Sequence, residues 1–130
     1  MTFLRTVLLF FFFLAFYPQL NAQNDGVSPS ERKVNYLNKR SRELRDKGDR
    51  DSALYFGQKA KTLSEKLNFV KGKTDAYLNL GVTYRELNRY SEAAKYLNLL
   101  IQICNQNHNE IGKGDAYDNF GHLYLAKGDT

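Results

Sequence analysis

The 130-residue sequence lacks the motifs on which a catalytic or metal-binding assignment would rest. It contains no Gly-x-Gly-x-x-Gly, phosphate-binding loop, His-Glu-x-x-His or Gly-x-Ser-x-Gly pattern, and no paired cysteines at metal-ligand spacing. Its two histidines, His108 and His122, stand on different predicted elements without a cysteine or carboxylate at ligand spacing. The sequence therefore predicts neither an enzyme nor a metal site, and it implies no cofactor.

Cysteine is almost absent, since Cys104 is the only one. A single cysteine excludes a disulfide within the chain, so the fold must be held by core packing. Cys104 lies in an apolar helical pattern with Leu97, Leu100 and Ile101. This pattern predicts a buried, inert thiol in preference to a nucleophile.

Charge is scarce at the amino terminus, where Arg5 is the only charged side chain in the segment 1–22. A continuous apolar run follows at positions 7–17, Pro18 ends it, and Ala22 supplies the small residue that signal peptidase requires before its cut. The alternative is a retained membrane anchor, but a membrane span needs roughly 20 apolar residues and this run is shorter. We expect residues 1–22 to be a signal peptide and the protein to be exported, either to the periplasm or into the medium.

The rest of the chain contains an internal repeat with a period of about 40 residues. Residues 72–90 match residues 112–130 at eight of 19 positions, and Gly48, Asn88 and Gly128 recur at this period as predicted turn residues. Apolar residues recur at three- and four-residue spacing on both sides of each turn, which predicts two helices in each repeat and an all-α fold. Two predicted helix starts are Ser28, a capping serine before Pro29, and Ser91 with Glu92.

The middle repeat resembles the tetratricopeptide repeat (TPR), a helix-turn-helix unit. Tyr77, the pair Leu80-Gly81, Tyr84 and Ala93 stand at the family's pattern positions. Gly81 and Ala93 are small, so we expect the two helices to approach closely there. The resemblance implies a right-handed TPR-like solenoid of about two and a half repeats.

Some features depart from the family's pattern. The period is about 40 residues against the family's usual 34, and we assign the six extra residues to longer second helices and connections. Leu100 and Asn105 stand where an Ala and a Pro are common, and the first repeat has Arg40-Ser41 in place of Leu-Gly. We expect a flexible lead-in at residues 23–29, a degenerate repeat at 30–72, a TPR-like repeat at 73–111 and the first helix of an incomplete repeat at 112–130.

The third repeat lacks a second helix to cover Tyr117, Phe120 and Tyr124. Helical repeats need stacked neighbours to bury such a face. We therefore expect the sequence to be the N-terminal fragment of a longer protein. The alternative is a complete small protein whose open end is covered by a partner or by a second copy.

In peptide-binding TPR proteins, the first helix of each repeat lines a concave groove. The resemblance implies that Asn79 and Asn119, which occupy the same place in successive repeats, hold a ligand's backbone there, because an amide both donates and accepts. Alternatively, both are polar residues that merely face solvent. The first repeat has Lys39 at this place. Other candidate peptide-binding residues are Asp75, Leu78, Val82, Arg85, Asp115, Asp118 and His122.

Basic residues are concentrated in one part of the chain. Residues 31–72 contain 12 Lys or Arg against 6 Asp or Glu, whereas residues 73–130 contain 6 against 7. Such a patch suits an acidic protein or an anionic membrane surface, although a solvated helix face is the commoner origin. Export and the lack of interleaved aromatic residues argue against nucleic acid.

We expect an exported scaffold that binds a protein or peptide. The alternative is the sensory region of a truncated histidine kinase or DNA-binding transcriptional regulator. In either case membrane contact is limited to export or to a part beyond the C-terminus.

Overall fold

The computed structural model describes residues 26–128, which are all-α. Five helices pack one after another in a TPR-like arrangement, as predicted, and the expected signal peptide at residues 1–22 lies outside the described residues. The helices are α2 (Pro29–Asp46), α3 (Arg50–Lys66), α4 (Val70–Glu86), α5 (Tyr90–Gln106) and α6 (Glu110–Ala126).

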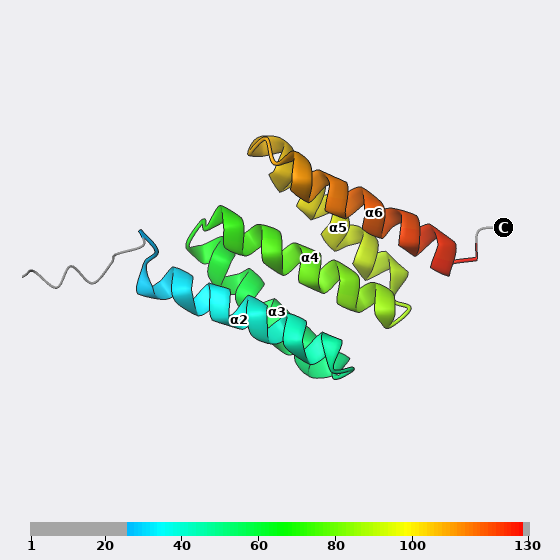
Figure 1. The fold of residues 1–130 in the computed structure, drawn as a ribbon, viewed down its shortest axis with the longest axis horizontal. Coiled ribbons are helices and arrows are strands. Elements are labelled where there is room, and N and C mark those ends of the chain that lie inside the picture. Colours follow the sequence, from blue (N-terminus) through cyan, green and yellow to red (C-terminus); the bar gives the residue numbers. More distant parts are fainter. Residues whose placement is uncertain (1–25, 129–130) are drawn as a thin grey trace, which may run out of the picture.

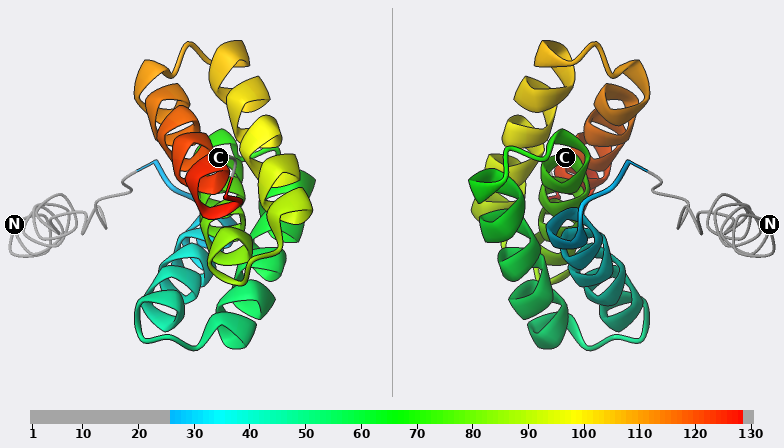
Figure 2. Two further views of the ribbon diagram at one scale, coloured as in Figure 1. Left: turned by 90° about the vertical axis from the view of Figure 1, so that its right-hand side faces the viewer. Right: turned by 90° about the vertical axis from the view of Figure 1, so that its left-hand side faces the viewer.

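The helices form two layers. Helices α2, α4 and α6 lie side by side in one layer, with α3 and α5 behind them (Figure 1). Seen along the long axis, the front layer curves around α4, which contacts all four other described helices (Figure 2). The first helix of each pair therefore contributes to one curved face.

Every connection between the described helices is built in the same way. A residue with a left-handed backbone recurs every 20 positions, at Gly48, Asn68, Asn88, His108 and Gly128, with φ between 49° and 87°. In each of the four connections between helices, the N–H after this residue donates to a carbonyl five residues earlier, which closes the preceding helix. The turns predicted at Gly48, Asn88 and Gly128 are confirmed, whereas those at Asn68 and His108 are additional.

The helix lengths correct one expectation. Helices α3, α4, α5 and α6 have 17 residues each, and the connections between consecutive helices have three. The six extra residues of the period were expected in longer second helices and connections, and the structure shows instead that first and second helices have nearly the same length, so the second helices are not the longer ones of each pair.

Of the two predicted helix starts, one is confirmed. The Ser28 hydroxyl accepts from the Glu31 N–H at 3.1 Å, and the Glu31 carboxylate accepts from the Ser28 N–H at 2.7 Å, which completes a capping box. The predicted start at Ser91 is wrong, because the turn at Asn88 places Arg89 at the cap and α5 already begins at Tyr90.

The core is centred between α4 and α5. A Cβ atom on Gly81 would lie 2.9 Å from Leu97 Cδ2, so the predicted close approach of the two helices is confirmed. Tyr84 stacks on Tyr96 with their ring centroids 5.6 Å apart, and Gln58 of α3 donates to both hydroxyls, at 3.3 and 3.0 Å. This cluster joins α3, α4 and α5.

Candidate protein-binding face

Three of the sequence-predicted site residues lie together on α4. Asp75, Val82 and Arg85 are half-buried and follow helical spacing on the side opposite Tyr77 and Tyr84, which face the core. Asp75 Oδ2 lies 2.7 Å from Lys71 Nζ. The Nε of Arg85 is buried, and no acceptor among the described residues reaches it.

The α6 candidates are more exposed. Asp115, Asp118 and His122 are all solvent-accessible. His122 Nε2 lies 3.5 Å from Asp118 Oδ2, an ion pair when the imidazole is protonated. The expectation that no carboxylate stands within reach of His122 is therefore wrong, because Asp118 lies one helical turn before it. This end of the face therefore presents two carboxylates to solvent.

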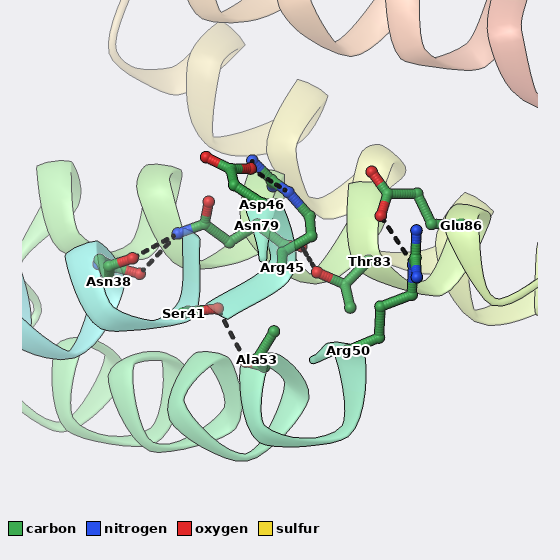
Figure 3. A network of polar contacts seen from close by, with 9 residues as sticks. All are labelled: Asn38, Ser41, Arg45, Asp46, Arg50, Ala53, Asn79, Thr83 and Glu86. Atoms are coloured by element: carbon green, nitrogen blue, oxygen red, sulfur yellow. Dashed lines mark hydrogen bonds and ion pairs between the residues drawn. The ribbon is translucent and has the colours of Figure 1, made fainter. Parts of the chain in front are cut away.

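Asn79 does not face solvent, and that expectation is wrong. Its side chain is only 5% exposed, and its Nδ2 donates to Asn38 of α2, at 3.2 Å to the backbone oxygen and 3.4 Å to Oδ1 (Figure 3). Asn38 in turn donates to the backbone oxygen of Gly72 at 3.0 Å. Asn79 thus fastens α4 to α2, and its amide N–H groups are directed at the neighbouring helix.

Asn119, the counterpart of Asn79, behaves differently. It is half-buried, and its Nδ2 donates to the backbone oxygen of Asp115 in its own helix at 2.8 Å. The candidate Leu78 packs against the core cluster around α4 and α5. The structure therefore does not place the two asparagines in equivalent surroundings, although their sequence positions are equivalent.

Polar contacts connect α2 to α3 and α3 to α4, and the sequence did not predict them. Arg50 Nε of α3 lies 3.0 Å from Glu86 Oε2 of α4, and the Ser41 hydroxyl of α2 donates to the Ala53 carbonyl of α3 at 2.8 Å (Figure 3). No signal in the sequence identified these pairs, because the partners lie 36 and 12 residues apart.

A second surface feature was also not predicted. A groove of about 660 Å³, here called the lysine-rimmed groove, lies along α3 and the edge of α2. Its lining is mainly apolar with a basic rim and consists of Lys33, Leu37, Leu54, Tyr55, Gln58, Lys59, Thr62, Leu63 and Lys66. The only sequence feature that pointed to this groove was the excess of Lys and Arg in residues 31–72.

Cys104 is buried, as predicted. A Cβ atom on Gly112 would lie 2.6 Å from its Sγ atom, so α6 approaches α5 closely there. Burial and, next, the negative charge of Asp115 raise the pKa of the Cys104 thiol, which disfavours the reactive thiolate.

Two kinds of feature are absent from residues 26–128. No three side chains among His, Cys, Asp and Glu are grouped so that they could hold a metal ion. None of the described helices combines the length and apolar character that crossing a membrane requires.

Comparison with known proteins identifies the class of repeat. Residues 74–107, which span most of α4 and all of α5, match the tetratricopeptide repeat family. The chain therefore contains a tetratricopeptide repeat, a helical unit that generally binds protein partners. No curated protein and no solved structure matched the chain.

Proposed function

We propose that the protein is an exported scaffold that binds a protein or peptide on the curved face of α2, α4 and α6. The observation that carries this proposal is the unpartnered Nε of Arg85 on α4. A buried guanidinium N–H without an acceptor is rare, because its desolvation is uncompensated. A ligand carboxylate or backbone carbonyl seated beside Arg85 would supply the missing acceptor.

The charges around Arg85 indicate what such a ligand would be. Asp75 already has Lys71 as its partner, whereas Asp115 and Asp118 are exposed at the α6 end of the face. A peptide with an acceptor opposite Arg85 and a basic residue toward α6 would match this distribution. Val82, half-buried on α4 three residues before Arg85, offers an apolar contact.

Selection from a displayed peptide library tests this function. Peptides selected against the protein should bind an Arg85→Gln variant about tenfold more weakly or worse, because a charge-assisted hydrogen bond is lost. Arg45→Gln is the matched control, since Arg45 holds the equivalent position in the first repeat but already lies 3.2 Å from Asp46 Oδ1. Equal losses in both variants, or none in either, would contradict the assignment of Arg85.

Export has a test of its own. The protein recovered outside the cytoplasm should begin at Gln23, because Ala22 supplies the small residue before the cut. N-terminal sequencing of that material checks the position. Recovery of the chain only from the cytoplasm, beginning at Met1, would contradict the proposal.

A further inference from the structure

Helix α3 carries the lysine-rimmed groove on a side that its counterpart α5 also turns to solvent. Asn98 and Gln106 lie on this side of α5 and are exposed, although α4 and α6 both pack against that helix. The exposure of this outer side is thus a property of the repeat and does not follow from the ends of the chain. Its basic charge is particular to α3, because Leu99 and Gln106 stand one period after Lys59 and Lys66.

The cations around the groove lack acidic partners. Lys33, Lys59 and Lys66 form no ion pair with a carboxylate among the described residues. Outside the groove, by contrast, Lys61 of the same helix lies 3.4 Å from Glu65 Oε1. Carboxylates of a partner placed at the rim would therefore meet ammonium groups that no acid neutralises.

The positive charge is distributed along the groove. Lys59 Nζ lies 4.5 Å from the centroid of the Tyr55 ring, in the half of the groove near the start of α3, whereas Lys66 ends that helix. Helices α2 and α3 run in opposite directions, and the Ser41 hydroxyl bonds α3 near its start. Lys33 lies roughly 12 Å along α2 from Ser41, toward the Lys66 end. Cations at both ends suit a partner with several carboxylates along its length, not a ligand with a single charged head group.

The floor of the groove determines which backbone conformation such a partner can have. Leu37, Leu54 and Leu63 supply apolar surface, and the Gln58 amide already donates to two tyrosine hydroxyls of the core. An extended peptide would leave backbone N–H and C=O groups against this surface without hydrogen-bond partners. A helix satisfies those groups internally and can direct an apolar stripe at the leucines.

From these observations we propose that the lysine-rimmed groove binds an acidic, amphipathic helix of another protein. The groove runs roughly 18 Å along α3 from Leu54 to Lys66, which matches about 12 residues of helix. The apolar stripe of the partner helix lies on the leucines, and its acidic residues face the lysine rim. The inference goes beyond the proposed function, because the groove lies mainly on α3, in the layer behind the curved face of α2, α4 and α6 (Figure 1).

Binding of a designed peptide to the full chain tests the proposal. The probe is a labelled helical peptide of about 14 residues with leucines at positions i, i+3, i+4 and i+7 and glutamates flanking that stripe. Fluorescence anisotropy should show that Lys59→Gln with Lys66→Gln weakens binding at least tenfold. Lys47→Gln with Lys95→Gln, an equal change in net charge outside the groove, should change it less than about twofold. All four side chains are exposed, so circular dichroism should show unchanged helicity.

A matched pair of tyrosines tests the apolar part of the contact. Tyr55 in the groove and Tyr36 outside it are 56% and 58% exposed. Tyr55→Ser should weaken binding of the probe several-fold, whereas Tyr36→Ser should leave it unchanged. Arg85→Gln, which tests the proposed function, should not affect this probe, so failure of one proposal can be distinguished from failure of the other.

Three results would overturn the proposal. The first is a probe that does not bind the unmodified protein in any register of its leucine stripe. The second is an equal loss of binding in the two lysine variants, because attraction would then depend only on net charge. The third is binding of vesicles that contain anionic phospholipid, lost in the Lys59 and Lys66 variant, with no binding of the peptide, since the surface would then dock on a membrane. A peptide with lysines in place of the glutamates should not bind.

Discussion

Helices α4 and α6 have the most similar sequences of the described helices, yet their surroundings differ. Helix α4 lies between the other described helices and contacts α2, α3, α5 and α6, whereas α6 contacts only α4 and α5 among them. Tyr77, Gly81 and Asn79 are all buried in α4. Their counterparts Tyr117 and Gly121 are exposed. An identical residue thus packs in one repeat and faces solvent in the next.

The asparagines show how a neighbouring helix decides the role of a residue. Asn79 meets Asn38 of α2, which offers two oxygen acceptors at 3.2 and 3.4 Å. One period later, the counterpart of Asn38 is Leu78, which offers no side-chain acceptor to Asn119. Asn119 therefore bonds within its own helix. The contact between α2 and α4 is polar at this point, whereas α4 presents the apolar side chain of Leu78 at the corresponding position.

Substitution of the equivalent glycines Gly81 and Gly121 should give the largest difference in stability between α4 and α6. Gly81→Leu should lower the free energy of unfolding by about 3 kcal/mol, because even a Cβ there would lie 2.9 Å from Leu97 Cδ2. Gly121→Leu is the matched change and should leave stability unchanged or raise it by up to about 1 kcal/mol through helix propensity. Urea denaturation of both variants at low protein concentration measures the difference, and equal destabilisation would show that α6 is covered.

A smaller effect is expected from the asparagines. Asn79→Ala should cost about 1 to 2 kcal/mol, because it leaves the buried Asn38 Oδ1 without its donor. Asn119→Ala should cost less than about 0.5 kcal/mol, since its bond lies within a partly exposed helix. Thermal unfolding checks both values. If Asn119→Ala proved the more costly change, the contrast between the two helix contacts would be refuted.

The smallest effect is the pH dependence carried by the tyrosines. Burial and the hydrogen bond to Glu65, 2.8 Å from the Tyr77 hydroxyl, raise the pKa of Tyr77 above its ordinary value. The unfolded chain would release this proton near pH 10, whereas the folded chain retains it, so stability falls as pH rises above about 10.

The matched pair Tyr77→Phe and Tyr117→Phe isolates this contribution. Tyr77→Phe should flatten the decline in unfolding free energy between pH 9 and 11, measured by urea denaturation at each pH, while Tyr117→Phe should leave the slope as it is. Identical slopes in the two variants would remove Tyr77 as the cause.

Much of the fold could be predicted from sequence because the signals are local. A glycine or asparagine in a left-handed turn and apolar residues at helical spacing act within a few residues, so the helix pairs and three of the five left-handed turn positions were predicted. Asn68 and His108 were missed because neither belongs to the periodic set of Gly48, Asn88 and Gly128. The true spacing of left-handed residues is 20, which only the structure shows.

The candidate site was less predictable, because its chemistry depends on contacts between helices. Asp75, Val82 and Arg85 share a half-buried side of α4, as helical spacing predicted, but the spacing did not indicate that Asn79 reaches α2. The degenerate first repeat shows the same limit. Ser41 stands where the middle repeat has Gly81. The space for its side chain is provided by Gly57 on α3, because a Cβ atom added to Gly57 would lie 3.1 Å from the Ser41 hydroxyl oxygen.

The regular recurrence of left-handed residues has a further consequence. The left-handed residues recur at a fixed spacing along the chain. Removing or duplicating one whole period between two equivalent turns would therefore leave every remaining turn intact. The length of the protein can thus change by a whole helix pair without rebuilding a connection, and only the surfaces on either side of the junction must be matched anew.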